Sequence, residues 1–96
     1  MPNTAPKVSI GLAVYNGDTY LKEAVDSILT QTFTDFELII SDNASTDRTE
    51  EICRAYATQD ERIRYHRNAT NIGGANNENQ TCEMARGKYF RWAAHD

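Results

Sequence analysis

The chain has 96 residues, of which 40% are hydrophobic and 25% are charged, and its formal net charge is −4. This composition is typical of an ordinary globular domain with one core and not of a disordered or fibrous protein. The acidic balance, without a basic stripe interleaved with aromatic residues, argues against a long nucleic acid as partner, although a single nucleotide stays possible.

Two strand–helix units are predicted in the first half of the chain. Residues 7–15 (KVSIGLAVY) form an apolar run typical of a strand buried in a parallel sheet. Residues 19–31 repeat apolar side chains at helical spacing, and Asp18 or Thr19 is the expected cap. Residues 36–41 (FELIIS) predict a second strand.

The second half predicts two more strands and two helices. A helix capped from residues 45–47 is expected to end near Thr58. Residues 62–66 (RIRYH) alternate in the manner of an edge strand. Half of residues 71–80 are Asn or Gln, which predicts a polar turn and the start of a helix. Residues 88–94 (KYFRWAA) predict the fourth strand.

The order βαβαβαβ with short connections predicts a parallel α/β sheet in one domain spanning residues 1–96. Apolar side chains inside these elements are expected in its core. They are Met84, Tyr89, Trp92 and the two cysteines, Cys53 and Cys82, which we interpret as reduced thiols.

Polar clusters follow the predicted strands. Ligands of an open parallel sheet bind at the carboxyl ends of its strands, where the strand order reverses. If the first strand is central and the fourth lies on its other side, this point lies between those two strands. The clusters are Tyr15-Asn16-Gly17, Asp42-Asn43, residues 71–74 and His95-Asp96.

The chemistry available at this edge is that of carboxylates and amides. The chain lacks GxGxxG after the first strand and GxxxxGK[ST] anywhere, which disfavours a dinucleotide enzyme and a P-loop NTPase. A carboxylate can accept hydrogen bonds from a base or a ribose, but one acid is too few for a metal site. Asp42 is also a common type of turn residue, and His95 is more readily a packing residue than a base or ligand.

Four ordered segments resemble family 2 glycosyltransferases along nearly the whole chain. They are VSIGLAVYNG (8–17), YLKEAVDSILTQTFTDFELIISDNASTDRT (20–49), NIGGANNEN (71–79) and ARGKYFRWAAHD (85–96). The resemblance implies the N-terminal nucleotide-binding part of a Rossmann-like, three-layer GT-A fold. It also implies a nucleotide-diphosphate-sugar donor, most often a UDP-sugar, inverting hexosyl transfer, and a divalent cation, Mn²⁺ or Mg²⁺.

The resemblance also implies roles for individual residues. Ala13 stands where many members have Pro, and Asn43 stands where many have a second Asp. By this resemblance, Ala13, Tyr15 and Asn16 border the nucleoside, and Asp42 and Asn43 contact the base. The segment from Gly73 to Asn79 is implied to pass near the nucleotide. Asp96 resembles the first acid of the DxD-type motif, which lies near the ribose and the metal.

No catalytic residue is assigned within the chain, because the resemblance places the base beyond Asp96. We therefore expect the 96 residues alone to be inactive and to self-associate through an uncovered sheet edge. The acceptor is not identified. No signal peptide or long apolar segment is present, so we expect a cytoplasmic protein, with any membrane association coming from other parts of a longer parent.

Two alternatives remain. A non-catalytic receiver- or flavodoxin-like module shares the alternating pattern, but Tyr15-Asn16 and Arg67-Asn68 stand where a receiver needs its acids. The chain could also be a structural portion that binds nothing.

Overall fold

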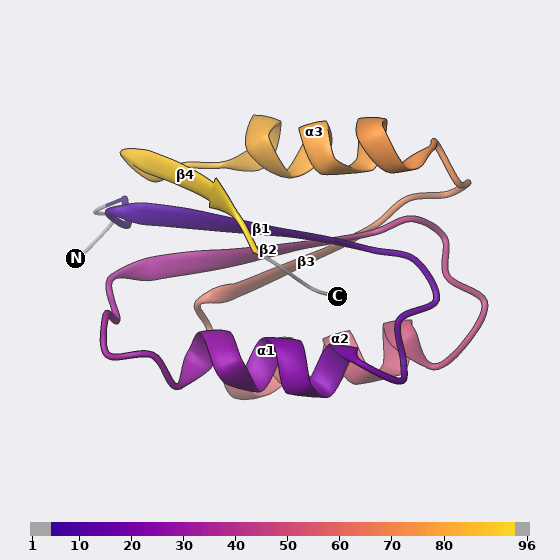
Figure 1. The fold of residues 1–96 in the computed structure, drawn as a ribbon, viewed down its shortest axis with the longest axis horizontal. Helices are drawn as coiled ribbons and strands as arrows, with labels where there is room; N and C mark the ends of the chain where they lie inside the picture. Colours follow the sequence, from indigo (N-terminus) through magenta and orange to yellow (C-terminus); the bar gives the residue numbers. More distant parts are fainter. Residues whose placement is uncertain (1–4, 94–96) are drawn as a thin grey trace.

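The computed structural model describes residues 5–93. All seven predicted elements are present in the predicted order, and the parallel α/β architecture is confirmed. The elements are β1 (Val8–Val14), α1 (Leu21–Leu29), β2 (Phe36–Asp42), α2 (Thr49–Gln59), β3 (Ile63–Arg67), α3 (Gly74–Met84) and β4 (Tyr89–Trp92) (Figure 1).

The strand order is β3-β2-β1-β4, and every pair is parallel. The strand order therefore reverses between β1 and β4, as the sequence predicted. β1 pairs with β2 along its whole length but pairs with β4 only as far as Gly11 and Trp92. Among the described residues, the carboxyl end of β1 therefore extends past the last paired residue of β4.

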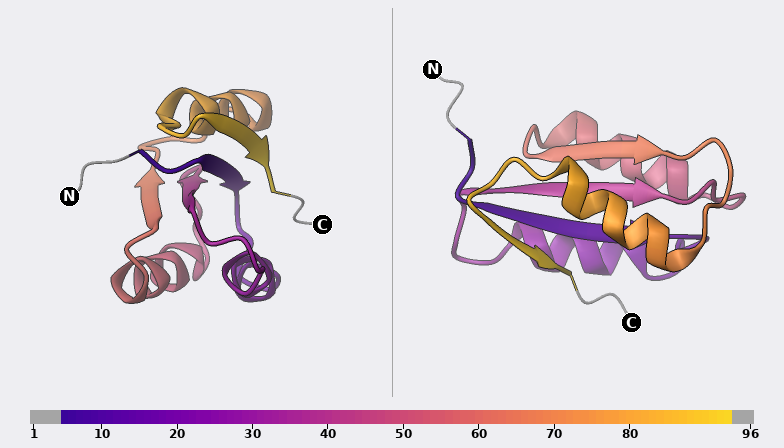
Figure 2. Two further views of the ribbon diagram at one scale, coloured as in Figure 1. Left: turned by 90° about the vertical axis from the view of Figure 1, so that its left-hand side faces the viewer. Right: turned by 90° about the horizontal axis from the view of Figure 1, so that it is seen from above.

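Three layers make up the fold. Helices α1 and α2 cover one face of the sheet and α3 covers the other (Figures 1 and 2). The α1/α2 side holds the hydrophobic core, because alternate residues of each central strand point toward it. The buried side chains of this core include Ile10, Leu12, Val14, Leu21, Val25, Leu38, Ile40 and Cys53.

The face under α3 is polar and closely packed. α3 buries Asn77 and Thr81, which are four residues apart and lie on one side of the helix. Gly11 lies beneath this side, and a Cβ there would overlap the Thr81 side chain. Because the contact is polar, α3 shows only a weak apolar stripe in the sequence. None of the helices in residues 5–93 is long and apolar enough to span a bilayer.

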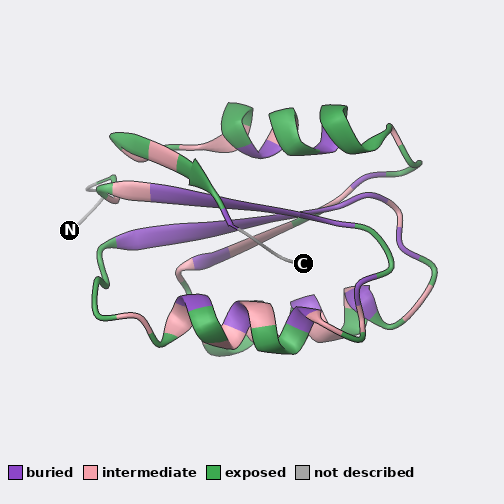
Figure 3. Ribbon diagram, in the orientation of Figure 1, coloured by how far each residue is buried: buried purple, intermediate pink, exposed green. Residues whose placement is uncertain are grey.

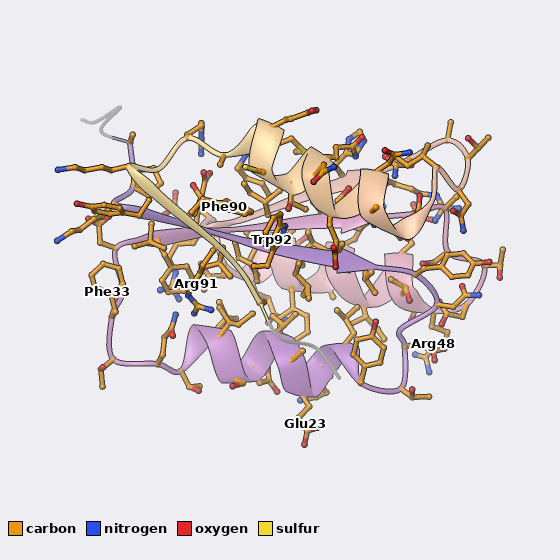
Figure 4. The ribbon with its side chains drawn as sticks, turned by 45° about the horizontal axis from the view of Figure 1, so that its top comes forward. Glu23, Phe33, Arg48, Phe90, Arg91 and Trp92 are labelled. Atoms are coloured by element: carbon orange, nitrogen blue, oxygen red, sulfur yellow. The ribbon has the colours of Figure 1, made fainter. Side chains whose placement is uncertain are left out.

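Several expected core residues are exposed. Tyr89 and Trp92 are 54% and 51% exposed, because β4 forms the edge of the sheet and neither helix layer covers it fully (Figures 3 and 4). Cys82 is exposed because the buried side of α3 runs through Asn77 and Thr81. Met84 is only partly buried, whereas Cys53 is fully buried as expected. Self-association through the β4 edge stays a prediction.

A buried glutamate joins the amino ends of the strands to the α3–β4 connection. Glu37 is 3% exposed, and its carboxylate accepts hydrogen bonds from Ser9 Oγ (2.6 Å), the Arg86 N–H (2.7 Å) and Arg64 Nη1 (3.0 Å). Ser9 Oγ in turn accepts the Gly87 N–H at 2.8 Å. Through these bonds Glu37 sets where β4 begins beside β1.

Candidate functional site: a hollow at the carboxyl end of β1

A hollow of about 230 Å³ lies at the carboxyl end of β1, one of the two strands between which the strand order reverses. It is bordered by β1, by the loops after β1 and β2, and by the first turns of α3. Its lining residues are Ala13, Val14, Tyr15, Tyr20, Asn43, Gly74, Asn77 and Glu78. Three of the predicted site residues, Ala13, Tyr15 and Asn43, are therefore brought together, and Gly74 follows the predicted Gly73.

Asn43 holds the β2 loop against the loop before α3. Its side chain is almost fully buried, at 2% exposed for the residue. Asn43 Nδ2 donates to Asn71 Oδ1 at 2.9 Å. Asn43 Oδ1 accepts from Asn68 Nδ2 at 3.0 Å and from the Ile72 N–H at 2.9 Å. The amide of Asn43 is therefore fixed in one orientation at the wall of the hollow.

Behind Asn43 the amide network continues into α3. Asn77 Nδ2 donates to the Ser41 carbonyl (2.9 Å), and Asn77 Oδ1 accepts from Ser41 Oγ (2.7 Å) and Asn68 Nδ2 (3.1 Å). Gln80 Nε2 donates to Ser41 Oγ and to Asn68 Oδ1. Asn71, Asn77 and Gln80 of the Asn-rich segment are thus built into this network, whereas Asn76 and Asn79 are exposed.

Asp42 does not line the hollow. It is fully buried, and its carboxylate accepts from the Ser45 N–H (3.0 Å), Tyr65 Oη (2.6 Å) and Arg67 Nη1 (3.4 Å). Burial and then the bond to Asp42 raise the pKa of the Tyr65 phenol well above its ordinary value, so the phenol remains a donor. In this structure Asp42 ties β2 and its loop to β3.

Asn16 joins the loop after β1 to the loop after β2. Its Oδ1 accepts the Thr46 N–H at 2.8 Å, and its own N–H donates to Ser45 Oγ at 2.9 Å. One residue further on, the Gly17 N–H donates to Thr49 Oγ1 at 2.9 Å. Asn16 has a φ of +49°, a left-handed conformation that Asn tolerates better than most residues. Asn16 thus supports the edge of the site without lining the hollow.

The starts of α1 and α2 differ from the helix caps that the sequence predicted. Neither Asp18 nor Thr19 caps α1, because Tyr20 occupies the N-cap position and no side chain caps the helix. The Asp18 carboxylate accepts the Arg48 N–H at 3.3 Å, and the first turn of α1 closes on the Gly17 carbonyl through the Leu21 N–H. The N-cap of α2 is Arg48 and not one of residues 45–47, but Asp47 still accepts the Thr49 N–H at the start of the helix, at 2.9 Å.

Ala44 gives a stability prediction. It has a φ of +64°, where a Cβ is unfavourable and glycine is not. Ala44→Gly is expected to raise the free energy of unfolding by about 0.5–1 kcal/mol, since relief of the left-handed strain outweighs the added freedom of the unfolded chain. Urea unfolding followed by circular dichroism measures the change. Ala55→Gly, on the exposed side of α2, is the control and should destabilise the chain.

Tyr20 was not predicted at the site, whereas Gly74, Asn77 and Glu78 fall in the segment from Gly73 to Asn79 that the resemblance implies near the nucleotide, without a role for any one of the three. Gly74, Asn77 and Glu78 are spaced i, i+3 and i+4, so a helix beginning at Gly74 presents them on one side. That spacing could have identified them. Burial, with the nearby Asp47 carboxylate, raises the pKa of the Tyr20 phenol, so it stays a neutral group at the hollow.

The remaining predicted site residues lie elsewhere. Gly73 precedes α3 with a φ of +92° and donates its N–H to Asn71 Oδ1 at 2.8 Å. His95 and Asp96 lie outside the described residues. Within residues 5–93, no three His, Cys, Asp or Glu side chains form a group able to hold a metal ion. The side chains of residues 5–93 therefore do not by themselves fit the predicted cation.

Solved structures share this fold. The crystal structure of S. aureus TarS 1-349 in complex with UDP-GlcNAc matches with a TM-score of 0.82 and 28% identity over 90% of this chain and 25% of that one. A mannosyltransferase from Pyrobaculum calidifontis, in complex with GDP-Man and Mn²⁺, matches with a TM-score of 0.78 and 24% identity, over 90% of this chain and 26% of that one. The second likeness concerns the fold alone, which is that of GT-A glycosyltransferases.

Sequence comparisons agree with the structural ones. An uncharacterized glycosyltransferase of Methanocaldococcus jannaschii is 41% identical over 87 residues, covering 88% of this chain and 30% of the relative. Glycosyltransferase GlyG of Streptococcus pneumoniae is 38% identical over 83 residues, covering 86% of this chain and 28% of the relative. The chain thus spans less than a third of these relatives. The family model for glycosyl transferase family 2 matches residues 9–96, and the chain belongs to this family.

Proposed function

We propose that the hollow at the carboxyl end of β1 binds the nucleoside part of a nucleotide-diphosphate-sugar donor, for inverting hexosyl transfer by a longer parent protein. The observation that carries the proposal is the position of the hollow. In a chain of this family, it lies at the carboxyl end of β1, beside which the strand order reverses, and open α/β sheets bind nucleotides outside the carboxyl ends of strands at such a point.

The volume of the hollow indicates that only part of the donor would bind inside it. Sites for whole small molecules usually measure about 300–1,000 Å³, and this hollow measures about 230 Å³. It can take a base with part of its ribose but not a complete nucleotide sugar. The diphosphate and sugar would then lie outside it, beyond the carboxyl end of β1.

The chemistry of the lining fits a nucleoside. Tyr15 and Tyr20 offer aromatic surface, Asn43 and Asn77 offer amides, and Glu78 offers a carboxylate that can accept from ribose hydroxyls. A carboxylate repels a diphosphate, so Glu78 favours an orientation with the phosphates pointing away from it.

A uridine nucleotide is the donor that we propose first. TarS, which shares 28% identity and a TM-score of 0.82 with this chain, has been crystallised with UDP-GlcNAc. We further propose that a divalent cation, Asp96 and the diphosphate meet in the parent protein. The catalytic base and the acceptor site would lie in regions of the parent protein that correspond to the parts of the relatives that this chain does not span.

Titration with UDP tests the proposal directly. We expect amide chemical shifts to change at Tyr15, Asn43 and Gly74 and to stay constant on α2. Ala13→Phe, which fills the hollow, should weaken UDP binding at least tenfold, equivalent to about 1.4 kcal/mol.

Ala55→Phe is the matched control, because it adds the same side chain in the groove between α1 and α2. It should leave the UDP affinity unchanged. Circular dichroism checks that both variants fold. Absence of shifts at millimolar UDP, or equal binding by the two folded variants, would contradict the proposed site.

A further inference from the structure

Among residues 5–93, the partners of the Asn43 amide leave one of its hydrogen-bonding positions unused. An Asn side chain has two acceptor lone pairs on its oxygen and two N–H donors. Both lone pairs of Asn43 Oδ1 are used, by Asn68 Nδ2 and the Ile72 N–H, and one N–H is used by Asn71 Oδ1. The group that remains is one N–H of a residue that lines the hollow.

Backbone groups prevent the amide from turning over. The Ile72 N–H can only donate, so a reversed Asn43 would place its NH₂ against another donor. Asn71 is held in the same way, because its Oδ1 also accepts the Gly73 N–H at 2.8 Å. The two backbone donors therefore determine which atom of each amide faces the other.

The other end of the network is fixed as well. The Ser41 carbonyl can only accept, so it must face Asn77 Nδ2, which leaves Asn77 Oδ1 to accept from Asn68. Asn68 Oδ1 in turn accepts from Gln80 Nε2 at 2.7 Å. Asn68 must therefore present its Nδ2 to Asn43 Oδ1. Each amide orientation follows from a backbone group, and none depends on the ligand.

We infer that Asn43 recognises its ligand as a hydrogen-bond donor and contacts an acceptor on the nucleobase, such as a pyrimidine carbonyl or an unprotonated ring nitrogen. This inference rests on the proposed function. A carboxylate at position 43 would do the opposite, because it can only accept and would select an N–H of the base. The N3–H of uracil is therefore not the group that Asn43 recognises.

A carboxylate would also disturb the loop. In Asn43→Asp, a carboxylate oxygen would replace the Nδ2 that now lies 2.9 Å from Asn71 Oδ1. Two acceptors would then face each other, and Asn71 could turn only by giving up its bond to the Gly73 N–H. The donor at position 43 and the acceptor at position 71 form a matched pair.

Binding of UDP to Asn43→Asp tests the inference. At pH 7 we expect this variant to bind UDP at least fivefold more weakly than the unchanged chain. Binding should recover as the pH is lowered, since a protonated carboxyl group regains a donor. The unchanged chain, measured at the same pH values, corrects for protonation of UDP itself. In the unchanged chain, the second Asn43 Nδ2 proton should move downfield when UDP is added.

Cys82→Asp is the matched control. Cys82 is exposed on α3 and does not line the hollow, so this variant adds the same charge nearby without changing the donor. It should bind UDP within twofold of the unchanged chain. Failure of the unchanged chain to bind UDP would overturn the proposed function and this inference together. Binding by the unchanged chain, with equal or tighter binding by folded Asn43→Asp at pH 7, would overturn this inference alone.

Discussion

Asp42→Ala is expected to lower the free energy of unfolding by about 3 kcal/mol, which corresponds to a fall of roughly 15 °C in Tm for a domain of this size. The substitution removes a fully buried carboxylate that accepts from the Ser45 N–H, Tyr65 Oη and Arg67 Nη1. These donors would lose a shared partner in surroundings from which water is largely excluded.

Thermal unfolding followed by circular dichroism measures this effect. Asp35→Ala is the control, because Asp35 is exposed just before β2 and its removal should change stability by no more than about 0.5 kcal/mol. If both variants unfold at the same temperature, Asp42 does not hold β2 to β3 as its contacts indicate.

Glu37→Gln is expected to lower the free energy of unfolding by about 2 kcal/mol at pH 7. The loss arises because a neutral amide replaces a carboxylate that accepts from Ser9, Arg64 and the Arg86 N–H. Arg64 and Arg86 are partly exposed, so water can compensate each of them in part, which keeps the effect below that of Asp42→Ala.

The effect of Glu37→Gln should depend on pH. Burial raises the pKa of Glu37, but hydrogen bonds from Ser9, Arg86 and Arg64 outweigh it and hold the pKa below its ordinary value of 4.5. The folded state therefore binds this proton less readily than the unfolded state. The stabilisation is complete above about pH 4.5 and is lost as the pH falls through the lower, folded value.

Urea unfolding at a series of pH values tests both parts of this prediction. The difference between the unchanged chain and Glu37→Gln should shrink in acid. Glu51→Gln, which removes an exposed ion pair with Arg48, should cost less than about 1 kcal/mol at any pH. A pH-independent difference for Glu37→Gln would show that the charge of Glu37 is not the source of the stabilisation.

The elements of the fold could be predicted because their signals are local. The apolar run of β1 and the helical spacing of α1 depend only on neighbouring residues. The exposure of Tyr89 and Trp92 could not be predicted in this way. A strand's own residues do not tell whether a second layer covers it, and β4 lies at the sheet edge.

The candidate site was predictable in position but not in detail. Parallel strands bring their carboxyl ends to one edge, so Ala13, Tyr15 and Asn43 were expected near one another, and they do line one hollow. Asp42 and Asn16 follow the same strands but contact protein groups instead. Neighbouring residues of a strand point to opposite faces, and the partners on each face come from distant segments.

The sequence by itself thus determined the parallel α/β order, the family and the edge of the sheet at which a ligand would bind. Only the tertiary structure decided which polar side chains at that edge line the hollow and which hold the protein together. The reason is that a hydrogen bond such as that between Asn43 and Asn71 joins residues 28 positions apart. Its direction, and the one Asn43 N–H that has no partner in the described part of the chain, depend on backbone groups that come together only when the sheet and α3 are assembled.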